Sequence, residues 1–200
     1  MRQNAFVPRN YEVAFAERPE VYAAWVQLNG AIKARMDLRR YELATLAAAR
    51  RLRSSYCCLA HGSVLAQQFG EPVREIALDH RAAGLDDVDV AVMDLAERVV
   101  EDATSIGDDD LRPLRALGLS ETEIMDVVLA ASARCFFSKT LDALGVLPDA
   151  GYAELEPDVR ILPGTILEGR TVVASGAVIG PDTRLVDTVR RTREDGAGIR

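Results

Sequence analysis

The chain is short of the features that membrane-spanning, disulfide-rich and nucleic-acid-binding proteins need. No apolar run approaches the roughly 20 residues of a membrane-spanning helix, and the start, MRQNAFVPRN, lacks the apolar centre of a secretory signal. Three cysteines, two of them adjacent, make a poor disulfide framework. The 24 Lys and Arg against 31 Asp and Glu give a net charge of -7, which argues against nucleic acid or an anionic membrane as a partner. We therefore expect a cytoplasmic protein.

Two different patterns occupy the two parts of the sequence. With 200 residues and 48% hydrophobic content, one ordinary domain and a modest appendage can form. Apolar residues recur at helical spacing up to about residue 150, as in Val21, Trp25, Leu28 and Ile32. We predict an all-α domain over residues 1–150 and a different tail over 151–200. Helices are expected over residues 19–36, 38–53, 54–69, 72–82, 86–105, 109–117 and 120–145, the last one beginning with a capping box.

The tail has a period of six residues. Ile161, Leu167, Val173, Ile179 and Leu185 stand six apart, and small or β-branched residues follow each of them by four. This period predicts short strands in a parallel β-helix, with three hexads in each coil. Fewer than two coils are present, so we expect a short hexapeptide-repeat tail that is weakly ordered or disordered unless it docks. The residues after Val189 lose the period and are expected to be disordered.

The densest chemistry lies in the segment SSYCCLAH, residues 54–61. If Ser54 is the N-cap of a helix, Cys57 occupies the third helical position, where free N–H groups and the helix dipole favour an anionic thiolate. His61 follows four residues later on the same face and could accept a proton directly or through one water. Cys58 faces elsewhere. The alternative is plain core packing, which is the commoner role of a Cys–His pair at this spacing.

Other candidate sites have less support from the sequence. Cys57, Cys58 and His61 do not supply tetrahedral ligand spacing, and no second Cys/His pair is present, so neither a metal nor a cofactor is expected. No glycine-rich elbow surrounds Ser54, which argues against a serine nucleophile. Cys135 is interpreted as a buried small residue.

The segment from Glu42 to His61 resembles the active-site region of the AhpD-like, or carboxymuconolactone decarboxylase, superfamily, in its peroxidase-related branch. That branch has a glutamate on one helix and a Cys-x-x-Cys-x-x-x-His motif that opens the next. Glu42, Cys57 and His61 match the glutamate, the second cysteine and the histidine, whereas Ser54 replaces the first cysteine. The resemblance covers about residues 5–150, including LRALGLSETEIMDVVLAASARCFFSKTLDALGV. It implies an AhpD-like helical bundle that assembles as a trimer or hexamer.

The resemblance also implies a thiol-dependent peroxidase with an antioxidant role. Cys57 would attack a hydroperoxide, His61 would act as the base, and Glu42 would orient the imidazole through water. Ser54 cannot resolve the resulting sulfenic acid, so an external thiol or dithiol would have to do so. Tyr56 could line the site or pack in the core. On the residues alone, Glu42 could instead be a solvated helix residue.

Two alternative functions stay open. The same fold supports cysteine-independent proton transfer, as in a lactone decarboxylase, and a non-catalytic oligomer would explain Ser54. The tail, residues 158–190, contains PDVRILPGTILEGRTVVASGAVIGPDTRL, which resembles the left-handed β-helix of the bifunctional N-acetylglucosamine-1-phosphate uridylyltransferase and glucosamine-1-phosphate acetyltransferase. About 30 residues are too few for an acyl-CoA cleft, so that activity is not implied.

Overall fold

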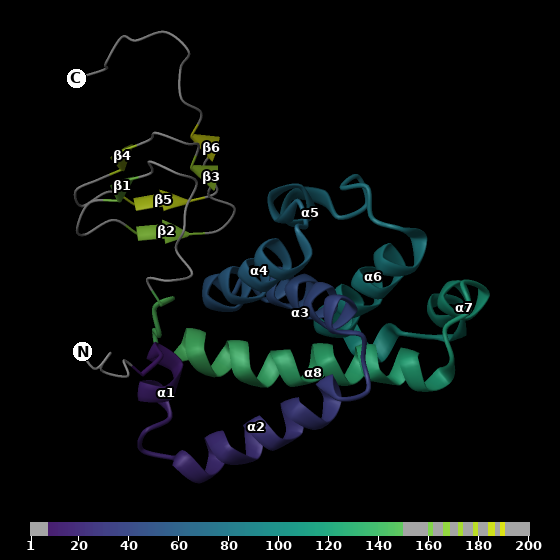
Figure 1. Cartoon of the computed structure of the whole chain (residues 1–200), viewed down its shortest axis with the longest axis horizontal. Coiled ribbons are helices and arrows are strands. Elements are labelled where there is room, and N and C mark those ends of the chain that lie inside the picture. The colour runs from purple at the N-terminus through teal and green to yellow at the C-terminus, as the bar shows by residue number, and fades with distance from the viewer. Residues whose placement is uncertain are drawn as a thin grey trace, which may run out of the picture. The chain divides into compact units, whose positions relative to one another are not determined.

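A computed structural model describes residues 8–149 and, further along the chain, the backbone of six short strands. The chain divides into two compact units, Met1–Tyr152 and Ala153–Arg200. The described part of the first unit is helical (Figure 1). Its helices are α1 (Asn10–Ala14), α2 (Pro19–Lys33), α3 (Leu38–Leu52), α4 (Ser55–Phe69), α5 (Val73–Asp79), α6 (Asp87–Asp102), a 3₁₀ turn (Ala103–Ser105), α7 (Asp108–Ala116) and α8 (Glu121–Ala143).

Helix α3 is the centre of the helical unit. It packs against α4, α6 and α8, and these helices surround it in Figure 1. Nine successive residues, 41–49, are buried, and four of them are alanines, which let neighbouring helices approach closely. A helix buried on all sides has no room for unpaired polar groups. Glu42 and Thr45 in this stretch therefore need partners inside the protein.

The ends of the helices follow their capping signals. Asp37 accepts a hydrogen bond from the backbone N–H of Arg40 at the start of α3, and Ser120 and Glu123 form the expected capping box at the start of α8. Helices α5 and α6 are shorter than expected, and a 3₁₀ turn replaces the last residues of the sixth. Helix α1 was not expected, because five residues are too few to show a helical period.

Aromatic rings from α1, the segment after it, α2 and α8 form a second core cluster. The ring of Phe137 stacks on Trp25 at 4.8 Å and on Phe15 at 5.9 Å between centroids. Tyr11 meets the edge of the same ring at 5.8 Å. This cluster encloses the side of α4 that carries Cys57. In the part of the chain that the structure describes, no helix is both long and apolar enough to cross a membrane.

The strands of the second unit pair in parallel across the six-residue repeats. The strands are β1 (Arg160–Ile161), β2 (Ile166–Glu168), β3 (Val172–Val173), β4 (Val178–Ile179), β5 (Arg184–Val186) and β6 (Val189–Arg190), paired as β1 with β4, β2 with β5 and β3 with β6. Arg160 pairs with Val178 and Ile166 with Arg184, the spacing of three hexads. The pairing of Val172 with Val189 is one residue shorter, where the period ends. The predicted repeat is therefore a coil of parallel strands. Arg190 was expected to be disordered but pairs with Val173 in β6, and the residues after it, 191–200, lie outside the described residues.

Candidate functional site

A tight turn between α3 and α4 sets the position of Cys57. Arg53 ends α3 in the left-handed conformation, with φ of 61°, which non-glycine residues rarely adopt. Ser54 then takes the extended N-cap conformation, so Cys57 is the third residue of α4. The Ser54 hydroxyl does not cap the helix but donates to Oδ1 of Asp142 in α8, at 3.1 Å. Ser54 is fully buried and does not line the cavity described below.

The three cysteines lie in different surroundings. Cys57 is 1% exposed, and its Sγ accepts a hydrogen bond from Nη1 of Arg134 at 3.7 Å. Burial raises the pKa of the neighbouring Cys58 thiol to about 12, and burial also raises the pKa of Cys135. Both of these cysteines therefore stay protonated at neutral pH. Cys57 alone among the three has a guanidinium at its sulfur.

The buried carboxylate of Glu42 is hydrogen-bonded to two nitrogen donors. Glu42 in α3 accepts from Nδ1 of His61 at 2.5 Å and from Nζ of Lys33 at 3.1 Å, one on each oxygen. Burial alone would raise the pKa of Glu42, but His61 and Lys33 together lower it below the usual value. The contact between Glu42 and His61 is direct, whereas the resemblance implied one through water. Glu42 is thus a paired interior carboxylate rather than a solvated one.

The hydrogen bonds at Nδ1 settle which nitrogen of His61 carries the proton. The Thr45 hydroxyl lies 3.2 Å from Nδ1 and donates its own proton to the backbone carbonyl of Tyr41, at 2.8 Å. Thr45 and the Glu42 carboxylate can therefore only accept from Nδ1, which places the proton there. Nε2 is left as a hydrogen-bond acceptor with no partner among residues 8–149.

His61 is neutral at physiological pH. Burial and, after it, the positive charge of Arg134 lower the pKa of His61 to about 4, although Glu42 opposes the change. The imidazole therefore has a free lone pair at Nε2 over the whole range above about pH 5. Such a group can accept a proton from a neighbouring acid.

Cys57 and His61 open on one cavity of about 340 Å³. Its walls come from α1, α2, α4 and α8 and are mostly aromatic and aliphatic. The lining residues are Tyr11, Tyr22, Trp25, Val26, Asn29, Gly30, Tyr56, Cys57, Ala60, His61, Arg134 and Phe137. Within residues 8–149, no direct hydrogen bond joins Sγ of Cys57 to His61. The space between them is therefore where a water or a substrate would carry a proton.

Arg134 and Lys33 are two residues of this site that the sequence reading missed. Arg134 follows the apolar run VVLAASA in α8, and a charged residue on the buried face of that helix was the available signal. Lys33 is at the end of α2, where a basic residue has an ordinary dipole explanation. No group of three His, Cys, Asp or Glu in the described part of the chain could hold a metal ion.

Comparison with solved structures decides the fold. The helical unit is similar to the crystal structure of an alkylhydroperoxidase AhpD core, an uncharacterized peroxidase-related protein from Ralstonia eutropha, with a TM-score of 0.68 and 19% identity over 72% of this chain and 78% of that one. The helical unit has the AhpD fold. A peroxidase-related protein from Silicibacter sp. gives a TM-score of 0.66 at 20% identity, covering 70% of this chain and 76% of that one. The putative antioxidant defence protein AhpD from Agrobacterium tumefaciens gives 0.58 at 18% identity, covering 66% and 91%.

Curated relatives match a short segment and not the AhpD-like unit. The bifunctional protein GlmU of Rubrobacter xylanophilus is 56% identical over 46 residues, which is 23% of this chain and 9% of that protein. GlmU of Kineococcus radiotolerans is 56% identical over 45 residues, 22% of this chain and 8% of the relative. The tail is thus a GlmU-like fragment, and the chain spans less than a tenth of these relatives. No family model matches the chain.

Proposed function

We propose that the AhpD-like unit is a thiol-dependent peroxidase in which Cys57 reduces hydroperoxides. The observation that carries this proposal is the shared cavity: the Cys57 thiol and the unpaired Nε2 of a neutral His61 both line it. Glu42 holds the other imidazole nitrogen and stabilises the positive charge that forms when His61 takes a proton. The peroxidase-related solved structures support the same assignment.

The reaction needs one proton transfer and one bond exchange. His61 takes the proton of the Cys57 thiol, through a water in the cavity, and the thiolate attacks the terminal oxygen of the hydroperoxide. The O–O bond breaks, and the departing alkoxide receives the proton from His61 and leaves as the alcohol. Sulfur loses two electrons and becomes a sulfenic acid, and the peroxide gains them. The aromatic walls of the cavity favour an organic hydroperoxide over a small polar one.

An external thiol completes the cycle, because the chain offers no resolving cysteine near Cys57. Ser54 stands at the place of the first motif cysteine, and a bridge to the adjacent Cys58 would strain the backbone. One thiol condenses with the sulfenic acid and releases water, and a second thiol then frees Cys57 and leaves as a disulfide. Since Cys57 is 1% exposed at a cavity of about 340 Å³, a small thiol fits this step better than a thiol on a protein surface.

Mass spectrometry with a sulfenic-acid trap tests the peroxidatic step. Reduced protein receives one equivalent of an organic hydroperoxide, and the trapped residue is identified by peptide mapping. We expect rapid labelling at Cys57 alone, with Cys58→Ser and Cys135→Ser proteins still active and Cys57→Ser protein inactive. A Cys57→Ser protein that still reduces peroxide would overturn the proposal.

Replacing Ser54 tests the resolving step separately. Ser54→Cys supplies a thiol three residues before Cys57, in the spacing of the motif. After one equivalent of hydroperoxide, we expect the variant to lose two hydrogens as an intramolecular disulfide, and a dithiol then to support turnover. Wild-type protein should show no such disulfide. Its appearance in wild-type protein would mean that another cysteine resolves Cys57.

Cysteine-independent proton transfer is the second candidate function, favoured by one observation. Arg134 places a buried cation on the wall of the cavity that the base His61 also lines, where it could bind an anionic carbonyl compound such as a lactone carboxylate. This function requires His61 but not Cys57. Proton exchange on such a substrate that survives in Cys57→Ser protein and is lost in His61→Asn protein would select it over the peroxidase.

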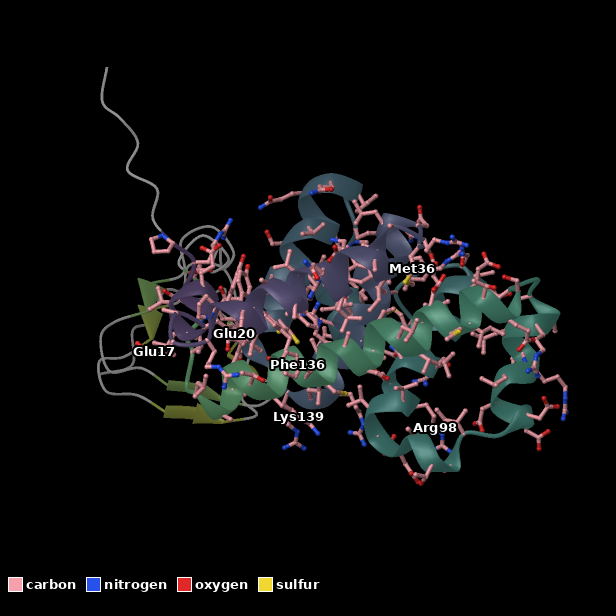
Figure 2. All side chains as sticks on the ribbon, turned by 90° about the horizontal axis from the view of Figure 1, so that it is seen from below. Glu17, Glu20, Met36, Arg98, Phe136 and Lys139 are labelled. Carbon is pink, nitrogen blue, oxygen red and sulfur yellow. The ribbon has the colours of Figure 1, made fainter. Side chains whose placement is uncertain are left out.

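We further propose that the protein is a homo-oligomer, a trimer or hexamer. Met125, Leu129 and Phe136 share one face of α8 and are 59%, 37% and 46% exposed, an apolar stripe that favours burial against another subunit. Figure 2 labels Phe136 on this helix, with Lys139 beside it. Light scattering at micromolar concentration should give an oligomer mass for the wild type and a smaller species for Phe136→Glu. A monomeric wild type would refute this proposal.

A further inference from the structure

Arg134 is a buried cation held by neutral groups. Its side chain lies over the rings of Trp25 and Phe137, with the guanidinium carbon 5.7 and 5.6 Å from their centroids. Nη2 donates to the hydroxyl of Tyr41 at 3.3 Å, and Tyr41 in turn donates to Oδ1 of Asn29 at 2.5 Å. The residue is 4% exposed, so its charge is almost completely removed from water.

No acidic side chain of residues 8–149 forms an ion pair with Arg134, and its Nε is buried without a hydrogen-bond partner. A buried charge without a counter-charge costs several kcal/mol, more than two ring contacts supply. The remaining Nη1 points at Sγ of Cys57, at 3.7 Å. A thiolate at that sulfur would supply the missing negative charge, and a neutral thiol would not.

The other titratable groups on the packed helices leave this charge uncompensated. They include Tyr11 on α1, Tyr22 and Lys33 on α2, Tyr41 and Glu42 on α3, Tyr56, Cys58 and His61 on α4, and Asp142 on α8. Asp149, beyond α8, accepts from the Tyr56 hydroxyl and pairs with Arg9. Lys33 pairs with Glu42, and His61 is neutral. Burial raises the pKa of both Tyr11 and Cys58 to about 12, so these two groups are uncharged at pH 7. Asp142 is exposed and accepts from Ser54.

We propose that Arg134 is a further catalytic residue of this site and holds Cys57 as a thiolate by direct charge pairing, an inference that rests on the proposed peroxidase function. The proton of the thiol leaves through Nε2 of His61 to water and returns by the same route to the alkoxide during the reaction. Arg134 stabilises the anion throughout, and His61 transfers the proton. The two tasks therefore belong to different residues on different helices.

The experiment measures how fast Cys57 is alkylated by iodoacetamide between pH 5 and pH 10. The background protein carries Cys58→Ser and Cys135→Ser, so that Cys57 is the only cysteine that iodoacetamide can alkylate. Arg134→Met keeps an unbranched side chain between the two rings and removes the charge, and Arg134→Lys keeps the charge. Arg98→Met is the matched control, because Arg98, labelled on α6 in Figure 2, is a half-buried arginine that pairs with Asp110 and does not line the cavity.

The background protein should show a pH midpoint below about 8.5, the ordinary value for cysteine. Arg134→Met should move this midpoint upward by about one pH unit or more and slow alkylation at pH 7 by roughly tenfold. The pH midpoint of Arg134→Lys should lie between those of the background protein and Arg134→Met, and the midpoint of Arg98→Met should equal that of the background protein. An unchanged midpoint in folded Arg134→Met protein would overturn the inference.

A second measurement does not depend on the folding of the Arg134 variants. The thiolate absorbance near 240 nm, followed by pH titration of the background protein, should disappear in the acid range rather than near pH 8.5. Titration at or above about pH 8.5 would overturn the role of Arg134. Peroxide reduction that depends on Cys57 but not on Arg134 would leave the proposed function intact and remove only this inference.

Discussion

The chain has two histidines, both nearly buried and both hydrogen-bonded to a carboxylate, yet their surroundings differ in one respect. His80, at the end of α5, places Nε2 at 2.7 Å from Oδ1 of Asp94, and Nη1 of Arg50 lies 3.3 Å from its Nδ1. Both ring nitrogens are therefore committed to the protein. His61 commits only Nδ1, and its other nitrogen opens on a cavity with a thiol.

Burial and a carboxylate partner therefore do not by themselves mark a proton-transfer group. His80 ties α5 to α6, and its hydrogen bonds resemble those of any interior polar group. A base needs a lone pair that faces a place where a reactant fits. Substitutions at the two positions should therefore have different effects on activity and on stability.

Asparagine at each position separates catalysis from packing. The amide of His61→Asn can still donate to Glu42 but has nothing at the position of Nε2, so the peroxidase kcat/KM should fall about 10²- to 10⁴-fold. His80→Asn should leave the activity of the folded protein nearly unchanged. Steady-state assays with an organic hydroperoxide compare the two. Equal losses of kcat/KM in the two variants would mean that His61 has no catalytic role that His80 lacks.

Stability should respond in the opposite order. His80→Asn breaks the contact with Asp94 and leaves a small void in a site that is 1% exposed, which should lower the free energy of unfolding by about 2–3 kcal/mol. His61→Asn keeps its main hydrogen bond and should lose less. Urea denaturation at pH 7.5 measures both. A larger loss for His61→Asn would mean that His61 is chiefly structural.

Acid should destabilise the protein through His61. Its pKa falls from 6.5 in the unfolded chain to about 4 in the folded protein, so between these values the unfolded chain binds more protons and the free energy of unfolding falls as the pH falls. Between pH 8 and pH 5, this residue should account for a loss of about 2 kcal/mol. The pH dependence of urea denaturation in wild type and His61→Asn isolates it. If the free energy of unfolding depended on pH equally in both proteins, His61 would not have a lowered pKa in the folded state.

The smallest effect concerns the hydroxyl of Thr45. Thr45→Val has nearly the same shape and removes one acceptor from Nδ1 of His61, while Glu42 remains. Losing one neutral hydrogen bond of about 1 kcal/mol should lower kcat/KM by roughly three- to tenfold, with KM little changed. His80 has no such hydroxyl contact among the described residues. A loss as large as that of His61→Asn would give Thr45 a further role.

Local signals made much of this arrangement predictable. Ser54 occupies the N-cap position of α4, although its hydroxyl does not cap the helix, so Cys57 is the third helical residue. The spacing of four residues puts His61 on the same face as Cys57. The period of six residues predicted the parallel pairing in the tail. These are short-range regularities, in which the geometry of one helix or one repeat determines the outcome.

Long-range contacts explain what the sequence did not predict. Arg134 lies 77 residues from Cys57, and nothing in the spacing of either residue indicates that α8 will bring them together. The direct contact of Glu42 with His61 depends on how closely α3 and α4 pack. Lys33 joins them from α2. Contacts of this kind depend on the packing of helices, which a single sequence does not display.

The long separation between Arg134 and Cys57 also has a consequence for synthesis of the chain. Helices α3 and α4 leave the ribosome before α8, so the thiol emerges without its guanidinium partner. Chains grow at roughly 5–20 residues per second, so Arg134, 77 positions after Cys57, is added several seconds later. The proposal for Arg134 implies that Cys57 gains its reactivity toward peroxide only when α8 docks. The rate at which Cys57 reacts in a growing chain would then report the docking of this helix.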